Sequence, residues 1–395
     1  MNTDELSILD LPGGDPRARG RAHGEALRAR IHELLDRWSE GLKAIYDVHP
    51  AYYVDRFCAE TRYRDTTWRL APSVMEEVAG IAEGAACDPD RLWVFQHVNE
   101  EFELAVQFAE RQRAEGGACS TIALAPREGR PGMIAQNLDL AEYLDGFQVL
   151  LRFPDARGEG LIMTLSVPGM LSLNGMNSHG FAVCDNTLKQ LRADPAGLPI
   201  YALYRILLES RSLEEALALV ERTPHAAGLN WVMGDPDGVV MVERSGGQMV
   251  VDRPSEGTVA YHTNHPFRCN DWAFDEAAVG ARPRPYRSSY LRLASLHQRL
   301  HNADPAGLGV AELRQVLAAR DDPDYPVSRG GGRNREDLEI GFTIACSVFE
   351  LDRARPRWHL ASGPTHETAM RTFDFDSPGT AAFNQPAQEA PVPPA

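Results

Sequence analysis

The stretch GGACSTIALAP, residues 116–126, divides the chain into two parts of different character. Two glycines and an alanine come first, then Cys119, and then a short apolar run that ends at Pro126. The small residues give the backbone conformational freedom, and the apolar run after them is typical of a buried strand. A cysteine at the start of a strand, directly after flexible backbone, is an unusual placement. The stretch marks where the fold changes and where chemistry is to be sought.

Upstream of this stretch the hydrophobic pattern is helical. Apolar residues recur every three or four positions from Asp15 to about Ile45, and the pair Asp15-Pro16 is typical of a helix N-terminus. Further helices are predicted over residues 51–86 and 89–113. The first hundred or so residues are therefore expected to be mostly helix.

Downstream, short apolar runs alternate with turn residues, which predicts a sheet. After the strand at Cys119, the predicted strands are 132–140, 147–154, 160–169, 180–188, 229–235, 238–244, 258–262, 340–351 and 355–362. Helical periodicity is confined to 199–222, 286–302 and 310–320. Helices followed by a set of strands predict an α+β layered fold.

The composition bounds the class of protein. The chain has 395 residues, 43% apolar and 24% charged, with a formal net charge of −16 and no basic run, so neither nucleic acid nor an anionic membrane is expected as a partner. No stretch approaches the roughly 18 apolar residues that span a bilayer, and the N-terminus lacks the pattern of a secretory signal. The six cysteines are scattered without a CxxC pair, which fits reduced thiols. We therefore expect a soluble, cytoplasmic protein.

The setting of Cys119 suggests a self-cleavage reaction. Small residues before it would let the thiol fold back onto its own preceding carbonyl and form a thioester. Hydrolysis would then free Cys119 as a new N-terminus, whose amine, with a pKa of about 7.7–8.0, could accept the thiol proton. From the residues alone, a buried structural cysteine is the favoured explanation.

Further motifs follow Cys119 in order. They are AQNLDL (135–140), LNGMNSHGFAVCDNTL (173–188), HTNHPF (262–267) and DDPDYPVSRGG (321–331), and PGGDPRARGRAHGEALRARI (12–31) precedes them. With GACSTIALAP, this series resembles the acyl-CoA:6-aminopenicillanic acid acyltransferase-like family (peptidase C45) of the N-terminal-nucleophile hydrolases. The resemblance extends over about residues 8–375. Each motif is weak by itself, and their common order makes the signal specific.

The resemblance implies a role for five residues. Cys119 would be both the self-cleavage residue and the catalytic nucleophile. Asp139 would hold the new α-amine or a substrate nitrogen, and Asn264 would place its side-chain amide in the oxyanion hole. Arg329 would close the site beside the nucleophile, and Asn186 matches a substrate-binding asparagine of the related bile-salt hydrolases.

The resemblance also implies the architecture, a four-layer α-β-β-α sandwich with two stacked antiparallel sheets. Cleavage between Ala118 and Cys119 would separate a helical segment, residues 1–118, from a catalytic core, residues 119–376. The two pieces should stay associated, because the helices of the first have apolar faces to bury. Residues 377–395 are rich in Pro and Ala and are expected to form a disordered tail.

Purely structural explanations exist for these site residues. Asp139 could be a turn residue at a strand end, Asn264 could shape a turn, and Arg329 could be a surface arginine beside three glycines.

The histidines offer a competing hypothesis, a metal site. His262 and His265 lie close in sequence, and His297 and His301 share a helix face at i,i+4 spacing. No carboxylate completes an HExxH arrangement, and the fingerprints of nucleotide binding are absent. The sequence therefore implies neither a metal nor a cofactor.

The function implied by the resemblance is acyl transfer through a thioester on Cys119. We expect hydrolysis of a small-molecule linear amide, because transfer needs a second binding pocket that no sequence feature indicates. An N-acyltransferase that uses an amide or an acyl-CoA-like thioester as donor is the alternative, and a non-catalytic binding protein of the same fold is more remote. The sequence leaves open the acyl group, the amine and whether the chain forms a homo-oligomer.

Overall fold

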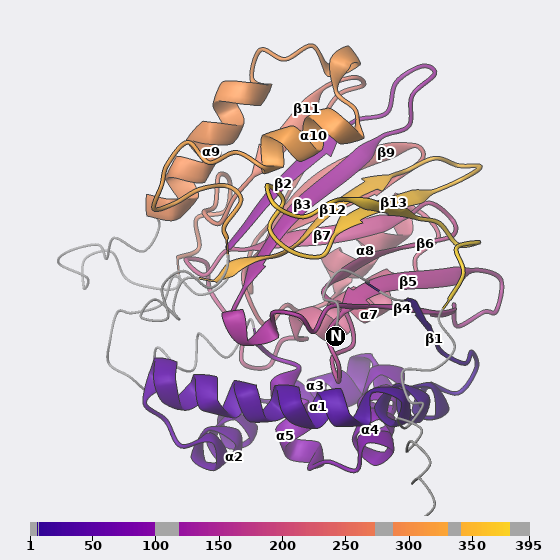
Figure 1. Ribbon diagram of the computed structural model, residues 1–395, viewed down its shortest axis with the longest axis vertical. Helices are drawn as coiled ribbons and strands as arrows, with labels where there is room; N and C mark the ends of the chain where they lie inside the picture. Colours follow the sequence, from indigo (N-terminus) through magenta and orange to yellow (C-terminus); the bar gives the residue numbers. More distant parts are fainter. Residues whose placement is uncertain (1–5, 7, 99–117, 273–286, 331–340, 380–395) are drawn as a thin grey trace, which may run out of the picture.

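Two β-sheets form the centre of the molecule (Figure 1). The computed structural model describes residues 6, 8–98, 118–272, 287–330 and 341–379. The larger sheet has eight strands in the order β1 (Ile8–Asp10), β4 (Val149–Pro154), β5 (Leu161–Ser166), β6 (Asn174–Asn177), β7 (Ala182–Thr187), β8 (Leu229–Asp235), β9 (Gly238–Arg244) and β10 (Met249–Asp252). The smaller sheet has six, in the order β11 (Val259–His262), β2 (Ala118–Leu124), β3 (Met133–Leu140), β12 (Phe342–Glu350), β13 (Arg357–Ala361) and β14 (Arg371–Phe373).

Helices cover the outer face of each sheet. Leucines of α9 (Arg287–Leu300) and α10 (Val310–Leu317) pack on the six-stranded sheet. Short 3₁₀ helices also occur at Glu142–Leu144 and Pro305–Gly307. On the other sheet, α8 (Leu213–Arg222) packs against β8, and Tyr204 of α7 (Ile200–Leu207) packs edge-on against Trp231. The predicted α+β fold with four layers, α-β-β-α, is confirmed.

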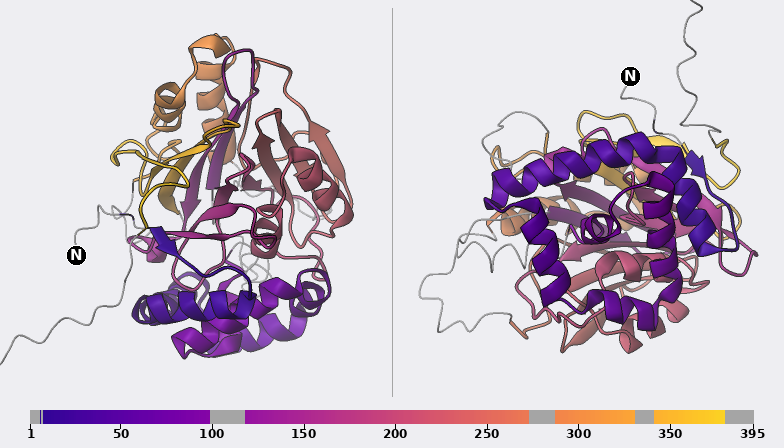
Figure 2. Two further views of the ribbon diagram at one scale, coloured as in Figure 1. Left: turned by 90° about the vertical axis from the view of Figure 1, so that its right-hand side faces the viewer. Right: turned by 90° about the horizontal axis from the view of Figure 1, so that it is seen from below.

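The N-terminal helices cover one end of the sandwich and lie below both sheets in Figure 1. In the right-hand view of Figure 2 they are arranged as a roughly rectangular frame across that end. They are α1 (Pro16–Tyr46), α2 (Pro50–Glu60), α3 (Tyr63–Leu70), α4 (Pro72–Ala85) and α5 (Pro89–Phe95). Four of the five begin with a proline, whose fixed φ and missing N–H suit the first helical position. No helix in the described ranges is both long and apolar enough to cross a membrane.

Glycines let α1 and α4 approach closely. A Cβ built on Gly24 would lie 2.3 Å from the carbonyl oxygen of Ile81, and one on Gly84 would lie 2.1 Å from that of Arg21. Gly20 and Gly80, each four residues before its counterpart, have equally little room. The crossing is therefore possible only with glycine at these positions, a small-residue pattern that the helical periodicity does not reveal.

Several predicted elements need correction. The helical stretch predicted over 51–86 is three helices. Thr61, with φ −108° and ψ 152°, ends the first, and Ala71, which precedes a proline and has φ −143° and ψ 60°, separates the other two. The helical stretch predicted over 199–222 consists of α7 and α8, and Ser212 caps the second of them. The sheets are not wholly antiparallel either, since β1 pairs with β4 in parallel.

Two predictions lie partly beyond the described residues. The helix predicted to reach residue 113 ends at Phe95, and residues 99–113 are outside the described part. Of the predicted tail, Ser377 is hydrogen-bonded to Asp374 and residues 380–395 are outside the described part.

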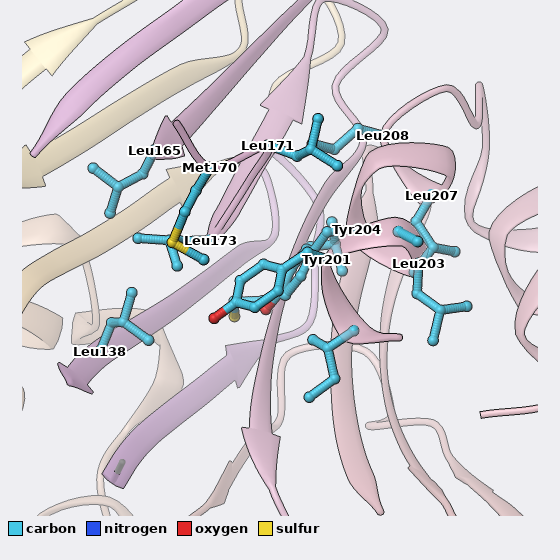
Figure 3. Packing of buried hydrophobic residues seen from close by; sticks show 14 of the residues in the cluster. Leu138, Leu165, Met170, Leu171, Leu173, Tyr201, Leu203, Tyr204, Leu207 and Leu208 are labelled. Carbon is cyan, nitrogen blue, oxygen red and sulfur yellow. The ribbon is translucent and has the colours of Figure 1, made fainter. Parts of the chain in front are cut away.

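Alternation along β2 separates two buried regions. Cys119 and Ala123 belong to the cluster between the sheets, whereas Ile122 and Leu124 belong to the cluster under α9 and α10. Between the sheets, Leu138 of β3 belongs to the same cluster as Leu165 of β5, the leucines of the 167–173 loop and the tyrosines of α7 (Figure 3). Leu138 is the register partner of Cys119, so the cysteine faces an apolar interior.

Candidate active site

Cys119 is buried near the start of β2, and two side chains form hydrogen bonds with its backbone. Its backbone N–H, which belongs to the Ala118–Cys119 peptide bond, donates to Asn264 Oδ1 at 2.8 Å. Its carbonyl oxygen accepts from Arg292 Nη1 at 2.5 Å. The strand starts one residue earlier than predicted, so the expected cleavage bond lies inside the β2–β3 ladder.

The orientation of the Asn264 carboxamide follows from its partners. Oδ1 receives two donors, the Cys119 N–H and Arg292 Nη2 at 2.8 Å, while Nδ2 donates to the carbonyl oxygen of Thr187 at 3.0 Å. The backbone of Asn264 is also held, with its N–H on Ser289 Oγ at 2.7 Å and its carbonyl accepting from Gln190 at 2.8 Å. In the uncut chain this residue binds the amide at the predicted cleavage site through its oxygen.

Arg292 is a site residue that the sequence motifs did not identify. It lies on the buried face of α9, is 1% exposed, and donates to Cys119, Ser120 and Asn264. A usable signal was present, because Ser288, Arg292, Leu296 and Leu300 follow one another at intervals of four and form the buried stripe of that helix. A cation on such a stripe needs buried partners.

Asp139 and Arg329 form a second group beside the peptide bond. Asp139 is the register partner of Ala118, and its Oδ1 accepts from Thr343 Oγ1 at 2.6 Å. Arg329 Nε lies 3.7 Å from Asp139 Oδ2, and Arg329 Nη2 donates to Ser288 at the base of α9. Arg329 is 4% exposed, so it is a buried partner of this carboxylate and not a surface arginine.

The surroundings of Asp139 shift its pKa in opposite directions. Burial raises the pKa of Asp139, while Arg329, Arg292 and the hydrogen bond from Thr343 oppose that shift. Among the described residues, nothing donates a hydrogen bond to Asp139 Oδ2.

Asn186 faces Cys119's strand from the other sheet. Its Oδ1 accepts from Thr121 Oγ1 at 2.7 Å and from Asn230 Nδ2 at 2.9 Å. Its Nδ2 is buried and finds no acceptor in the described part of the chain. Asn186 contacts β2 at Thr121, two residues along the strand from Cys119. Its amide nitrogen is therefore available there as a hydrogen-bond donor.

The thiol of Cys119 is not activated in the uncut chain. Burial raises the pKa of Cys119 well above its usual range, the carboxylates of Asp185 and Asp139 raise it further, and Arg292 opposes them. Asp185 is itself unusual: burial raises its pKa to about 7 against the hydrogen bond that Tyr204 donates to its Oδ1 at 2.5 Å. A thiol in this environment needs a base before it can attack a substrate.

The structure brings all five predicted site residues to one region, Cys119, Asp139, Asn264 and Arg329 directly and Asn186 across the sheets. The histidines have other partners. His262 pairs with Glu243 at 3.0 Å, and His297 bonds to Tyr261 and stacks on His301. No three His, Cys, Asp or Glu side chains within the described ranges could hold a metal ion together.

The four α-β-β-α layers with two stacked sheets are those of the N-terminal-nucleophile hydrolase fold. The family model of the acyl-coenzyme A:6-aminopenicillanic acid acyl-transferases matches residues 127–363. The chain belongs to this family. The match includes Asp139, Asn186, Asn264 and Arg329, and it begins eight residues after Cys119.

Similar solved structures are more distant. Penicillin V acylase from Agrobacterium tumefaciens is 19% identical with a TM-score of 0.41, over 65% of this chain and 86% of that one. Two variants of conjugated bile acid hydrolase from Clostridium perfringens are each 15% identical, with TM-scores of 0.42 and 0.39. These two matches cover 65% and 67% of this chain, and 92% and 100% of the respective hydrolase chain. A comparison with curated protein sequences gave no match.

Proposed function

We propose that the chain is a self-cleaving amidohydrolase with Cys119 as its nucleophile. The observation that carries the proposal is the pair of hydrogen bonds at Cys119. The N–H of the Ala118–Cys119 peptide bond donates to Asn264 Oδ1, and the Cys119 carbonyl accepts from Arg292. Strand β11 pairs with β2 only from Thr121 to Leu124, so at Cys119 two polar side chains, and not a neighbouring strand, bond to the N–H and the carbonyl of two adjacent peptide units.

Self-cleavage would proceed by an acyl shift. The Cys119 sulfur adds to the Ala118 carbonyl carbon, and the thiol proton passes to the amide nitrogen. The C–N bond then breaks, which leaves a thioester and a free amine. Water hydrolyses the thioester, giving the Ala118 carboxylate and a free thiol on an N-terminal Cys119.

The new amine would lie beside two acceptors. Asn264 Oδ1 already accepts from this nitrogen, and Asp139 lies opposite Ala118 in the ladder with Oδ2 still available. An α-amine has an ordinary pKa of about 7.7–8.0, so at neutral pH it can take the thiol proton.

The catalysed reaction would repeat this chemistry on a substrate. The thiolate attacks an amide carbonyl, the amine leaves with a proton from the α-ammonium, and water resolves the thioester. Asn264 would donate to the oxyanion, which requires release of Nδ2 from Thr187. Asn186 Nδ2 is a buried donor for another polar atom of the substrate.

The proposed substrate is a small-molecule linear amide. Penicillin V and a glycine-conjugated bile acid are suitable first probes, since they are the kinds of amide that the similar solved structures are named for. The name of the family supports the alternative, an N-acyltransferase with an acyl-CoA donor. Incubation with acyl-CoA and a panel of amines separates the two, because only a transferase forms amide product faster than it forms free acid.

The decisive experiment is the intact mass of the denatured protein, measured beside a Cys119→Ala variant and a Cys184→Ala control. Cys184 is also a buried cysteine, on strand β7 of the facing sheet. We expect fragments that end at Ala118 and begin at Cys119 in the wild type and the control, and an uncut chain in Cys119→Ala. An uncut wild type, together with Cys119 alkylation no faster than that of Cys58, would support the non-catalytic alternative instead.

A further inference from the structure

One buried carboxylate is bonded to both flanks of Asn264. Glu243 of β9 accepts three successive backbone N–H groups, from Phe267 at 2.5 Å, Arg268 at 2.9 Å and Cys269 at 2.7 Å. It also lies 3.0 Å from Nε2 of His262, the last residue of β11. The segment 262–269, which contains Asn264, is therefore bonded to the Glu243 side chain at both of its ends.

This contact joins the two sheets. Glu243 belongs to the eight-stranded sheet and His262 to the edge strand of the six-stranded sheet. Both are buried, at 4% and 2% exposure, and the His262 ring packs on Phe267 with centroids 4.0 Å apart. His262 Nδ1 bonds to the carbonyl of Thr263 at 2.6 Å, which fixes the residue next to Asn264.

The site suits an anion. Burial opposes ionisation of Glu243, but His262 and the three N–H groups outweigh it and hold its pKa below the usual range. Successive N–H groups that converge on one point form an anion-binding concavity in many proteins. The side chain fills that concavity from within the same chain.

We propose that Glu243 is a positioning residue, which sets Asn264 against the Cys119 amide by fixing the 263–269 loop to both sheets. The proposal rests on the function proposed above. Asn264 must lie within hydrogen-bond distance of the peptide bond before cleavage and of the oxyanion afterwards. A misplacement of about 1 Å in such a group can cost roughly 100-fold in rate.

The test compares Glu243→Gln with a matched control, Glu350→Gln. Glu350 also pairs with a histidine, His359 at 3.2 Å, and with Arg357, but it lies seven residues along β12 from Thr343. That is roughly 23 Å from the site. A glutamine amide cannot accept all three N–H groups, so the loop loses its anchor while the side chain keeps its size.

The expected result is a loss of rate without a matching loss of substrate binding. Glu243→Gln should slow self-cleavage at least about tenfold and lower kcat on a hydrolysed amide by a similar factor, with KM within about twofold. Glu243→Asp, which keeps the charge, should recover part of the rate. Glu350→Gln should change neither rate by more than about twofold, even at an equal loss of Tm. Equal rates in the two glutamine variants would overturn the proposal.

A second measurement does not depend on catalysis. In an uncleavable Cys119→Ala background, hydrogen exchange of the backbone amide at position 119 reports its bond to Asn264. Glu243→Gln should speed this exchange at least tenfold over the Glu350→Gln background. Unchanged exchange would overturn the positioning role even if the wild type proves inactive, whereas fast exchange with an inactive wild type would refute only the enzymatic function. If Glu243→Gln does not fold, His262→Gln serves with the same expected results.

Discussion

Arg292 donates to three groups around Cys119, and its planar guanidinium is what allows this. Lysine cannot reproduce the fork, and methionine would leave Cys119 O and Asn264 Oδ1 without this donor. We expect Arg292→Met to slow self-cleavage by about 100-fold, as for loss of a charge-stabilising donor, with Arg292→Lys in between. The intact-mass time course measures the effect. Arg299→Met on the same helix loses a partly exposed pair with Asp321 and hydrogen bonds to Ser295, and it should cleave normally. A normal rate in Arg292→Met would contradict the assigned role.

Asp185 predicts a pH dependence of stability. Its usual pKa is 3.8 and its folded pKa is about 7, so the folded state retains a proton that the unfolded state loses. Its favourable contribution is present below about pH 4 and is lost as pH rises to about 7. Each pKa unit corresponds to about 1.4 kcal/mol.

The variant Asp185→Asn cannot ionise and can still accept the bond from Tyr204. Its free energy of unfolding relative to wild type should therefore increase between pH 4 and pH 7, by about 4 kcal/mol at most, and then level off. Urea denaturation at pH 5 and pH 8 measures this difference. Asp237→Asn at the exposed β8–β9 turn should show no such trend, and a trend shared by both variants would contradict the account.

At the scale of elements, the crossing of α1 and α4 depends on glycine. A Cβ at Gly24 would meet backbone at 2.3 Å, which cannot move without separating the helices. We expect Gly24→Ala to destabilise the protein by about 1–3 kcal/mol, as overpacking does, although alanine favours an isolated helix. Gly41→Ala in the same helix meets the Tyr143 ring at 3.1 Å, which can shift, and should be nearly neutral. Thermal denaturation distinguishes them, and a neutral Gly24→Ala would show that the helices have room to move apart.

At the scale of the whole molecule, the segment before Cys119 is built into the core in two ways. Strand β1 pairs with β4, and Glu77 of α4 lies between Arg19 of α1 and Arg205 of α7, all three at most 4% exposed. We propose that the cleaved pieces stay together for this reason. Native gel filtration should show one species that contains both fragments, and its size also answers whether the chain forms a homo-oligomer.

Glu77→Gln tests the ionic part of that interface. Removal of the carboxylate leaves Arg19 without its buried partner and Arg205 with Glu209 alone, and breaking a buried pair typically costs about 3–5 kcal/mol. We therefore expect Glu77→Gln to unfold, or to release the N-terminal fragment, at clearly lower urea concentration than the wild type. Glu76→Gln in the same helix loses an exposed pair with Arg17 and should change stability by less than about 1 kcal/mol. Equal midpoints for the two variants would exclude the ionic contribution.

The sequence by itself determined the class of fold and the candidate residues. Hydrophobic periodicity and prolines are local signals, so they located most helices and strands, and ordered motifs indicated Cys119, Asp139, Asn264 and Arg329. Helix breaks at Thr61 and Ala71 were missed, because each leaves the apolar periodicity almost unchanged. The parallel pairing of β1 was missed since register between distant segments is not encoded locally.

Only the tertiary structure decided how the site is held together. In the sequence, Arg292 is marked only as a cation on the apolar stripe of a helix, and Glu243 looks like an ordinary charged residue. They become site residues because packing buries them against a peptide bond and a loop far along the chain. Tertiary structure also determined that the Asn264 oxygen, and not its amide nitrogen, faces Cys119 in the uncut chain. A buried charge must find partners wherever the fold places it, and those partners are separated by up to 173 residues here.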